Sequence, residues 1–110
     1  MYMYRASLDR IIGPVTVAVR VDLGFRLDLV VPIRLDGLAL PEDRRATQAI
    51  TQQWLDEHPR FVCQTIQGRR QTFDRWFGIL MDEDGSTLND ALLASGMVER
   101  IKSGEAPLED

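Results

Sequence analysis

The sequence predicts an α+β fold in which strands predominate. Long stretches alternate apolar and polar residues, as strands with one covered face do, whereas two other stretches carry apolar residues at helical spacing. Hydrophobic residues make up 45% of the 110-residue chain, which is enough for one modest core. We therefore expect one domain, over residues 1–101, followed by a flexible acidic tail over residues 102–110.

Alternation predicts three consecutive antiparallel strands near the N-terminus, over residues 2–8, 15–21 and 25–35. Gly13-Pro14 breaks the first alternation, and Asp22-Leu23-Gly24 is predicted to turn the chain from the second strand into the third. Val15 has the parity of the valines that follow it, so it is expected in the core.

The third strand leads into a turn and a helix. Its apolar positions have odd numbers from Phe25 to Leu35, so Arg34 is expected to look out of the core. Pro32 cannot donate to a strand ladder and predicts an edge, bend or bulge. Pro41 favours helix entry, which places Glu42 beside a helix N-terminus and, by prediction, close to Arg34.

Helical spacing predicts a first helix from about residue 43 to residue 57, ended by His58-Pro59. Thr87-Leu88-Asn89-Asp90 resembles a capping box and predicts a second helix that runs up to a glycine. Trp54 and Leu92 lie on the apolar stripes of the two helices and are expected in the core. The apolar stripe of the first helix is predicted to comprise Ala46, Ala49, Ile50 and Trp54.

Two shorter strands are predicted over residues 61–66 and from about residue 76 to residue 81. Cys63 lies among alternating apolar residues with no second cysteine, which indicates a buried, inert thiol. The polar loop between these strands, residues 67–75, holds the one concentration of arginines, and two interpretations stay open for it: a solvated hairpin tip or a phosphate contact.

The overall charge argues against broad affinity for nucleic acids. Seventeen acidic residues against thirteen Lys and Arg give a formal net charge of -4, which disfavours binding driven by counterion release. No apolar run approaches the roughly 20 residues of a membrane helix, and no basic segment precedes an apolar stretch at the N-terminus. We expect no membrane partner, no secretion, and a cytoplasmic or virion setting.

The block Arg34-Leu35-Asp36-Gly37-Leu38-Ala39-Leu40-Pro41-Glu42 resembles the staphylococcal-nuclease-like (thermonuclease) family. Val21-Asp22-Leu23-Gly24-Phe25 and Phe73-Asp74-Arg75-Trp76 match further family motifs in order and spacing, so the resemblance extends from about Arg5 to Met97. It implies a five-stranded barrel of the oligonucleotide/oligosaccharide-binding (OB) type with two helices. It also implies that Arg34, Glu42 and Arg75 hold the positions of the family's catalytic residues.

The family's calcium-binding aspartates have no counterpart in this chain. Their positions hold Val15 and Ala39, which supply no side-chain oxygen, whereas calcium needs several oxygen ligands. No metal and no other cofactor is therefore expected, and the leading hypothesis is a non-catalytic nuclease-like domain. It would serve as a binding or structural module with a protein partner, such as a small bacteriophage virion or assembly protein.

Two alternative functions remain. One is a calcium-dependent phosphodiesterase that cleaves DNA or RNA with Arg34, Glu42 and Arg75. The other is binding of single-stranded nucleic acid, which needs a positive groove with stacking aromatic residues. The candidate nucleic-acid-binding residues are Arg34, Arg69, Arg70, Phe73 and Arg75. In the non-catalytic hypothesis, Glu42 is expected to pair with the arginines in a structural cluster.

Overall fold

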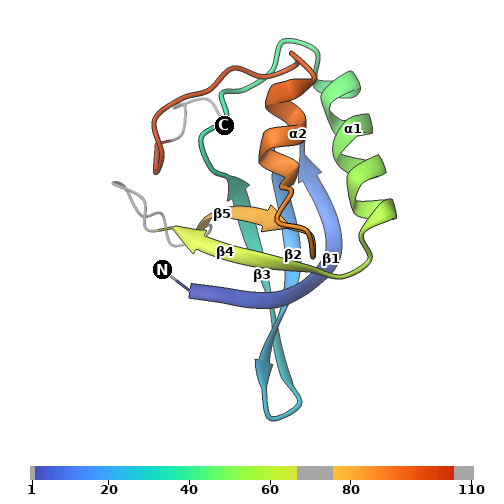
Figure 1. The fold of residues 1–110 in the computed structure, drawn as a ribbon, viewed down its shortest axis with the longest axis vertical. Helices are drawn as coiled ribbons and strands as arrows, with labels where there is room; N and C mark the ends of the chain where they lie inside the picture. Colours follow the sequence, from blue (N-terminus) through green and yellow to red (C-terminus); the bar gives the residue numbers. More distant parts are fainter. Residues whose placement is uncertain (1, 67–75, 106–110) are drawn as a thin grey trace.

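The computed structural model describes residues 2–66 and 76–105 and shows a closed five-stranded barrel with two helices (Figure 1). The strands are β1 (Tyr2–Gly13), β2 (Thr16–Gly24), β3 (Leu27–Leu35), β4 (Phe61–Ile66) and β5 (Trp76–Met81), and the helices are α1 (Arg44–Glu57) and α2 (Leu88–Ala94). The strand order is β1-β2-β3-β5-β4, and β4 pairs with β1 to close the barrel. The predicted fold class, a mostly-β OB-type barrel with two helices, is confirmed.

The barrel interior is filled by the alternating apolar residues of its strands. Val15 and the valines of β2 are buried there, as are Ile33 and Leu35 of β3 and Leu80 of β5. Gly78 lets β5 fit between β3 and β4, because a Cβ atom at this position would lie 2.8 Å from the Ile33 side chain. Closure of the barrel therefore depends on a residue without a side chain in the middle of β5.

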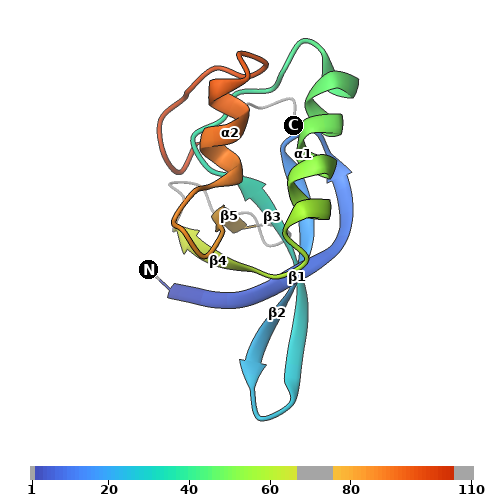
Figure 2. The same cartoon turned by 45° about the vertical axis from the view of Figure 1, so that its right-hand side comes forward.

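The two helices lie side by side at one end of the barrel (Figure 1, Figure 2). Asp43 caps α1 by accepting a hydrogen bond from the Ala46 amide at 2.9 Å. Thr87 caps α2 in the same manner, which confirms the N-cap predicted from the sequence. The buried face of α1 differs from the predicted stripe, because Ala49 is exposed. The residues of α1 that are buried are Thr47, Thr51, Trp54 and Leu55.

The β2–β3 hairpin projects from the other end of the barrel, away from the helices (Figure 1, Figure 2). Its turn lies at Phe25 and Arg26, directly after the predicted Asp22-Leu23-Gly24, because Gly24 still pairs with Leu27. The prediction that the apolar residues of β3 face the core from Phe25 onward is wrong for its first half. Alternation identifies one face of the strand, but this part of the strand extends past the barrel, where nothing described covers that face.

The segment after α2 returns to the chain that follows β3. A bridge pairs Leu38 with Arg100, the Ala39 amide donates to the Glu99 carbonyl at 2.9 Å, and the Ile101 amide donates to the Gly37 carbonyl at 2.8 Å. This segment fixes the chain at the carboxyl end of β3, where the candidate site residues lie.

Candidate functional site

Arg34 is fully buried, so the prediction that it looks out into solvent is wrong. It lies on β3 in register with Thr16 of β2 and Phe77 of β5, on the side opposite to Ile33 and Leu35. Arg34 therefore lies on the outer face of β3, as its parity predicts. That face is covered at this position, because Arg34 has 0% exposed surface. A buried guanidinium is costly unless its N–H groups are hydrogen-bonded.

The backbone of the turn after β3 supplies hydrogen-bond acceptors to Arg34. Its Nη1 donates to the Leu35 carbonyl at 3.0 Å, and its Nη2 donates to the Leu38 carbonyl at 2.6 Å. Gly37 makes this return possible because it has a positive φ of 77°, a conformation that other residues rarely adopt. The guanidinium thus joins the end of β3 to the turn that folds back over it.

Glu42 does not pair with Arg34, so this part of the predicted cluster is wrong. Among the ion pairs of the described residues none joins these two side chains, and Glu42 is exposed. The predicted position at the helix entry is nearly correct, because Glu42 directly precedes Asp43, the N-cap of α1. Its neighbour Pro41, by contrast, is buried.

Asp36 and Asn89 organise the same turn, and the sequence did not identify them as part of the site. Asp36 accepts hydrogen bonds from the Ser103 hydroxyl and the Gly104 amide, both at 2.7 Å. The Asn89 Nδ2 donates to the carbonyls of Asp36 at 3.0 Å and Gly78 at 3.2 Å. The capping box indicated only that Asn89 lies in the first turn of α2, not that its side chain is buried.

Among the described residues at this end of the barrel, the positions of the expected calcium ligands supply no side-chain oxygen. Val15 is in the core and Ala39 has no side-chain donor, as the sequence shows. Both carboxylate oxygens of Asp36 already accept hydrogen bonds. Within residues 2–66 and 76–105, no group of three or more His, Cys, Asp or Glu side chains is placed to hold a metal ion.

Four of the predicted site residues lie outside the described residues: Arg69, Arg70, Phe73 and Arg75. Their proposed roles in phosphate contact, base stacking and catalysis therefore stay predictions. Trp76, the first residue of β5, is described and is about half exposed, at 48%. It offers an aromatic surface at the start of the strand that pairs with the end of β3.

Cys63 is buried on β4, and burial raises the pKa of its thiol to about 12. The nucleophilic form of cysteine is the thiolate, which such a pKa makes scarce near neutral pH. The prediction of a buried thiol is confirmed, and its chemistry agrees with the inert role that the sequence indicated.

Neither helix of the described residues is long and apolar enough to cross a membrane. Comparison of the chain with protein-family models and with curated proteins returned no match.

Proposed function

We propose that this barrel is a non-catalytic, nuclease-like domain that serves as a binding or structural module for a protein partner, such as a component of a virion or its assembly. The observation that carries the proposal is the state of Arg34. Its side chain is fully buried and two of its nitrogens donate to the backbone carbonyls of Leu35 and Leu38. In this position the guanidinium supports the fold of the turn.

Two features of this end of the barrel weigh against the phosphodiesterase alternative. Stabilisation of a phosphoryl transition state requires donors aimed at the substrate, and loss of one such electrostatic element typically costs about a hundredfold or more in rate. Arg34 aims its Nη atoms at its own turn, and the carboxylates for calcium are absent at Val15 and Ala39. These losses together favour a domain without hydrolytic activity.

Binding does not require any of the lost groups. A barrel of this kind offers grooves and projecting loops to partners independently of chemistry, and a fold does not fix a function. Here several large apolar side chains of the projecting hairpin are exposed, Phe25 among them. Exposed apolar groups of this kind support a role in contact with another protein.

The test is a cleavage assay on heat-denatured, end-labelled DNA and on RNA, with calcium and with a chelator, beside an authentic thermonuclease as positive control. We expect no calcium-dependent cleavage by the wild-type chain. The matched variant is Arg75→Ala purified in parallel, since a contaminating nuclease would give equal cleavage in both preparations. Calcium-dependent cleavage that disappears in Arg75→Ala would overturn the proposal and favour the phosphodiesterase.

The same preparations test binding of single-stranded nucleic acid. Fluorescence anisotropy with labelled oligonucleotides should show no saturable binding at physiological ionic strength, because the chain carries a net charge of -4. Saturable binding that is lost in the double variant Arg69→Ala/Arg70→Ala would favour the nucleic-acid-binding alternative instead. Arg44→Ala/Arg45→Ala, on the exposed start of α1, is the charge-matched control.

A further inference from the structure

His58 joins the C-terminal end of α1 to the turn between β5 and α2. Its Nδ1 lies 2.6 Å from the carbonyl oxygen of Trp54, one turn back in α1. Its Nε2 lies 3.4 Å from Oδ2 of Asp82, in the turn that follows β5. Both side chains are mostly covered, with 25% of His58 and 16% of Asp82 exposed. Solvent and salt therefore screen this ion pair less than a pair on the open surface.

The two contacts of His58 need two protons on its ring. A carbonyl oxygen can only accept a hydrogen bond, so the contact with Trp54 requires a proton on Nδ1. A neutral imidazole carries one N–H group, so its Nε2 would then turn a lone pair toward the carboxylate of Asp82, which is itself an acceptor. Only the doubly protonated, positively charged ring is attracted to both partners.

The position of His58 on α1 also suits a positive charge. His58 is the C-cap of α1, and the dipole of a helix favours a cation at its C-terminal end. Its ring stacks on the ring of Trp54 with the centroids 4.1 Å apart, within the roughly 6 Å over which a cation is attracted to an aromatic face. The charged ring thus interacts favourably with the helix end as well as with Asp82.

The remaining charged residues around this contact are exposed and carry both signs. They neighbour His58 or Asp82 along the chain or line the same open groove as Asp82. These residues are Glu57, Glu83, Asp84, Arg5 and Arg60. Three of them are acidic and two are basic, so they do not oppose a positive charge on His58. Within the described part of the chain, Asp82 is the acid that forms an ion pair with His58.

Asp82 connects this contact to the start of α2. Its Oδ1 accepts hydrogen bonds from the amides of Asp84 and Ser86, each at 2.9 Å. The residue after Ser86 is Thr87, the N-cap of α2, which is bridged to Met81 of β5. The ion pair therefore links the end of one helix to the entry of the other.

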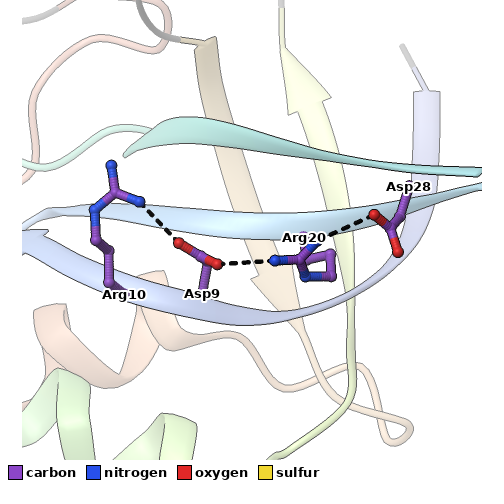
Figure 3. Close-up of polar contacts among 4 residues, drawn as sticks. All are labelled: Asp9, Arg10, Arg20 and Asp28. Carbon is purple, nitrogen blue, oxygen red and sulfur yellow. Dashed lines mark hydrogen bonds and ion pairs between the residues drawn. The ribbon is translucent and has the colours of Figure 1, made fainter.

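The other ion pairs of the described residues do not titrate near neutral pH. Arg20 of β2 binds Asp9 of β1 and Asp28 of β3, each at 3.1 Å, and Asp9 also binds Arg10 at 2.8 Å (Figure 3). Aspartate and arginine stay charged between about pH 5 and 8, whereas histidine gains or loses its charge in this range. His58 is the only histidine in the sequence, so a change of pH in this range acts on one ring.

We propose that the pair of His58 and Asp82 is a pH-dependent contact between the two helices, formed when His58 is protonated and lost when it is neutral. The protonated ring gains partners on folding, whereas the neutral ring does not. The stability that the contact contributes is therefore present near pH 5 and is lost as the pH rises to about 8. This inference does not depend on the proposed function, because Arg34 and its turn take no part in the contact.

The test is a double-mutant cycle of His58→Gln and Asp82→Asn, measured by urea unfolding at about pH 5.5 and about pH 8. We expect the two side chains to be coupled about fivefold in the equilibrium constant of unfolding at the lower pH and uncoupled at the higher pH. Asparagine keeps an oxygen that can accept from the amides of the turn. Any loss of packing in His58→Gln that does not depend on pH cancels in the cycle.

Two controls separate this contact from general effects of pH. The cycle of Arg20→Gln and Asp28→Asn removes an ion pair that does not titrate, so its coupling should be the same at both pH values. Glu83→Gln removes the acid next to Asp82 and should leave the coupling of His58 with Asp82 in place. A coupling between His58 and Asp82 that is equal at both pH values, or absent at both, would overturn the inference.

Nitrogen-15 NMR of the single imidazole gives a second, direct measurement. At about pH 8 the neutral ring should carry its proton on Nδ1, because the Trp54 carbonyl accepts from that atom. At about pH 5.5 both ring nitrogens should be protonated. A neutral ring with its proton on Nε2 could still donate to Asp82, so the contact would persist without the charge and the inference would fail.

Discussion

The Nη2 atom of Arg34 donates a hydrogen bond of 2.6 Å to the carbonyl oxygen of Leu38, four residues later in the chain. This bond joins the end of strand β3 to the loop that leads into α1, and both residues are fully buried. The Ala39 amide, next in the chain, is bound by the Glu99 carbonyl. Hydrogen bonds therefore link the Arg34 side chain, the turn after β3 and the segment after α2.

Arg34→Ala is expected to destabilise the protein strongly. The change removes charge-assisted hydrogen bonds to two buried carbonyls and leaves these acceptors unsatisfied, which should cost about 3–5 kcal/mol in the free energy of unfolding. Urea denaturation followed by tryptophan fluorescence measures this loss. Glu42→Ala is the companion variant, and because Glu42 is exposed and does not pair with Arg34, its cost should stay within about 0.5 kcal/mol.

The expected costs of Arg34→Ala and Glu42→Ala reverse the expectation from the sequence. There Glu42 was predicted to pair with two arginines, so that its removal would cost more stability than the removal of either arginine. If Glu42→Ala proved the costlier change, the pairing proposed from the sequence would be restored. A loss below about 1 kcal/mol for Arg34→Ala would show that water replaces the guanidinium at the carbonyls of Leu35 and Leu38.

Asp36→Ala is expected to release the segment around Ser103 and Gly104 while the barrel stays folded. Asp36 binds each of these residues at 2.7 Å, and hydrogen bonds to a charged group are worth about 1.5–3 kcal/mol each. Native-state hydrogen exchange should therefore show loss of protection at the Gly104 amide with little change in β2. Asp90→Ala, at an exposed site on α2, is the control. Unchanged protection of Gly104 would show that other contacts hold the segment.

The role of Asp36 illustrates what the sequence could not predict. Its position after β3 was evident, but its partners are 67 and 68 residues away in the chain. Residues from 102 onward were predicted to be a flexible tail from composition alone, and composition does not register a hydrogen bond from a distant turn. Periodicity predicts which face of an element is apolar, whereas contacts of this kind depend on how the chain returns in space.

Strands and helix caps were predictable because their signals are local. The bounds of β4 match the prediction of residues 61–66, and Asp43 and Thr87 act as N-caps where the sequence placed the helix starts. Whether a face of a strand is covered depends on parts of the chain that are distant in sequence, and the two main errors of the sequence-based prediction arise from this. Arg34 has the outward parity expected but is buried, whereas Phe25 has the inward parity expected but lies beyond the barrel.

Trp54→Ala is expected to cost about 3–5 kcal/mol, the usual range for a buried aromatic residue truncated to alanine. Trp54 is 8% exposed, which confirms its predicted place in the core. Its ring stacks on His58 with the ring centroids 4.1 Å apart, and it makes an edge contact with Phe61. Chemical denaturation followed by far-UV circular dichroism measures the change. Trp76→Ala serves for comparison and should cost clearly less, because Trp76 is about half exposed. Equal costs would show that burial of Trp54 is not what stabilises α1 on the barrel.

Cys63 should make the stability of the protein depend on pH in alkaline solution. Burial raises the pKa of its thiol from 9.0 to about 12, so between these values the unfolded chain loses the thiol proton while the folded chain keeps it. The unfolded state then binds fewer protons, and the free energy of unfolding falls as pH rises, by at most about 1.4 kcal/mol per pH unit from this group. The contribution is present in full below pH 9.0 and is lost as the pH rises toward 12.

The measurement compares denaturation midpoints of the wild type and Cys63→Ala from pH 7 to pH 10.5. The alanine variant is less stable by an amount that does not depend on pH, because its lost side chain does not titrate. The wild type alone loses stability as the pH rises past 9.0, so the difference in the free energy of unfolding between the two proteins should shrink. In parallel, the native thiol should resist a disulfide reagent at pH 8 and react fully once urea unfolds the chain. Rapid modification of the native protein, or a difference that does not change with pH, would show that Cys63 is more accessible than its burial indicates.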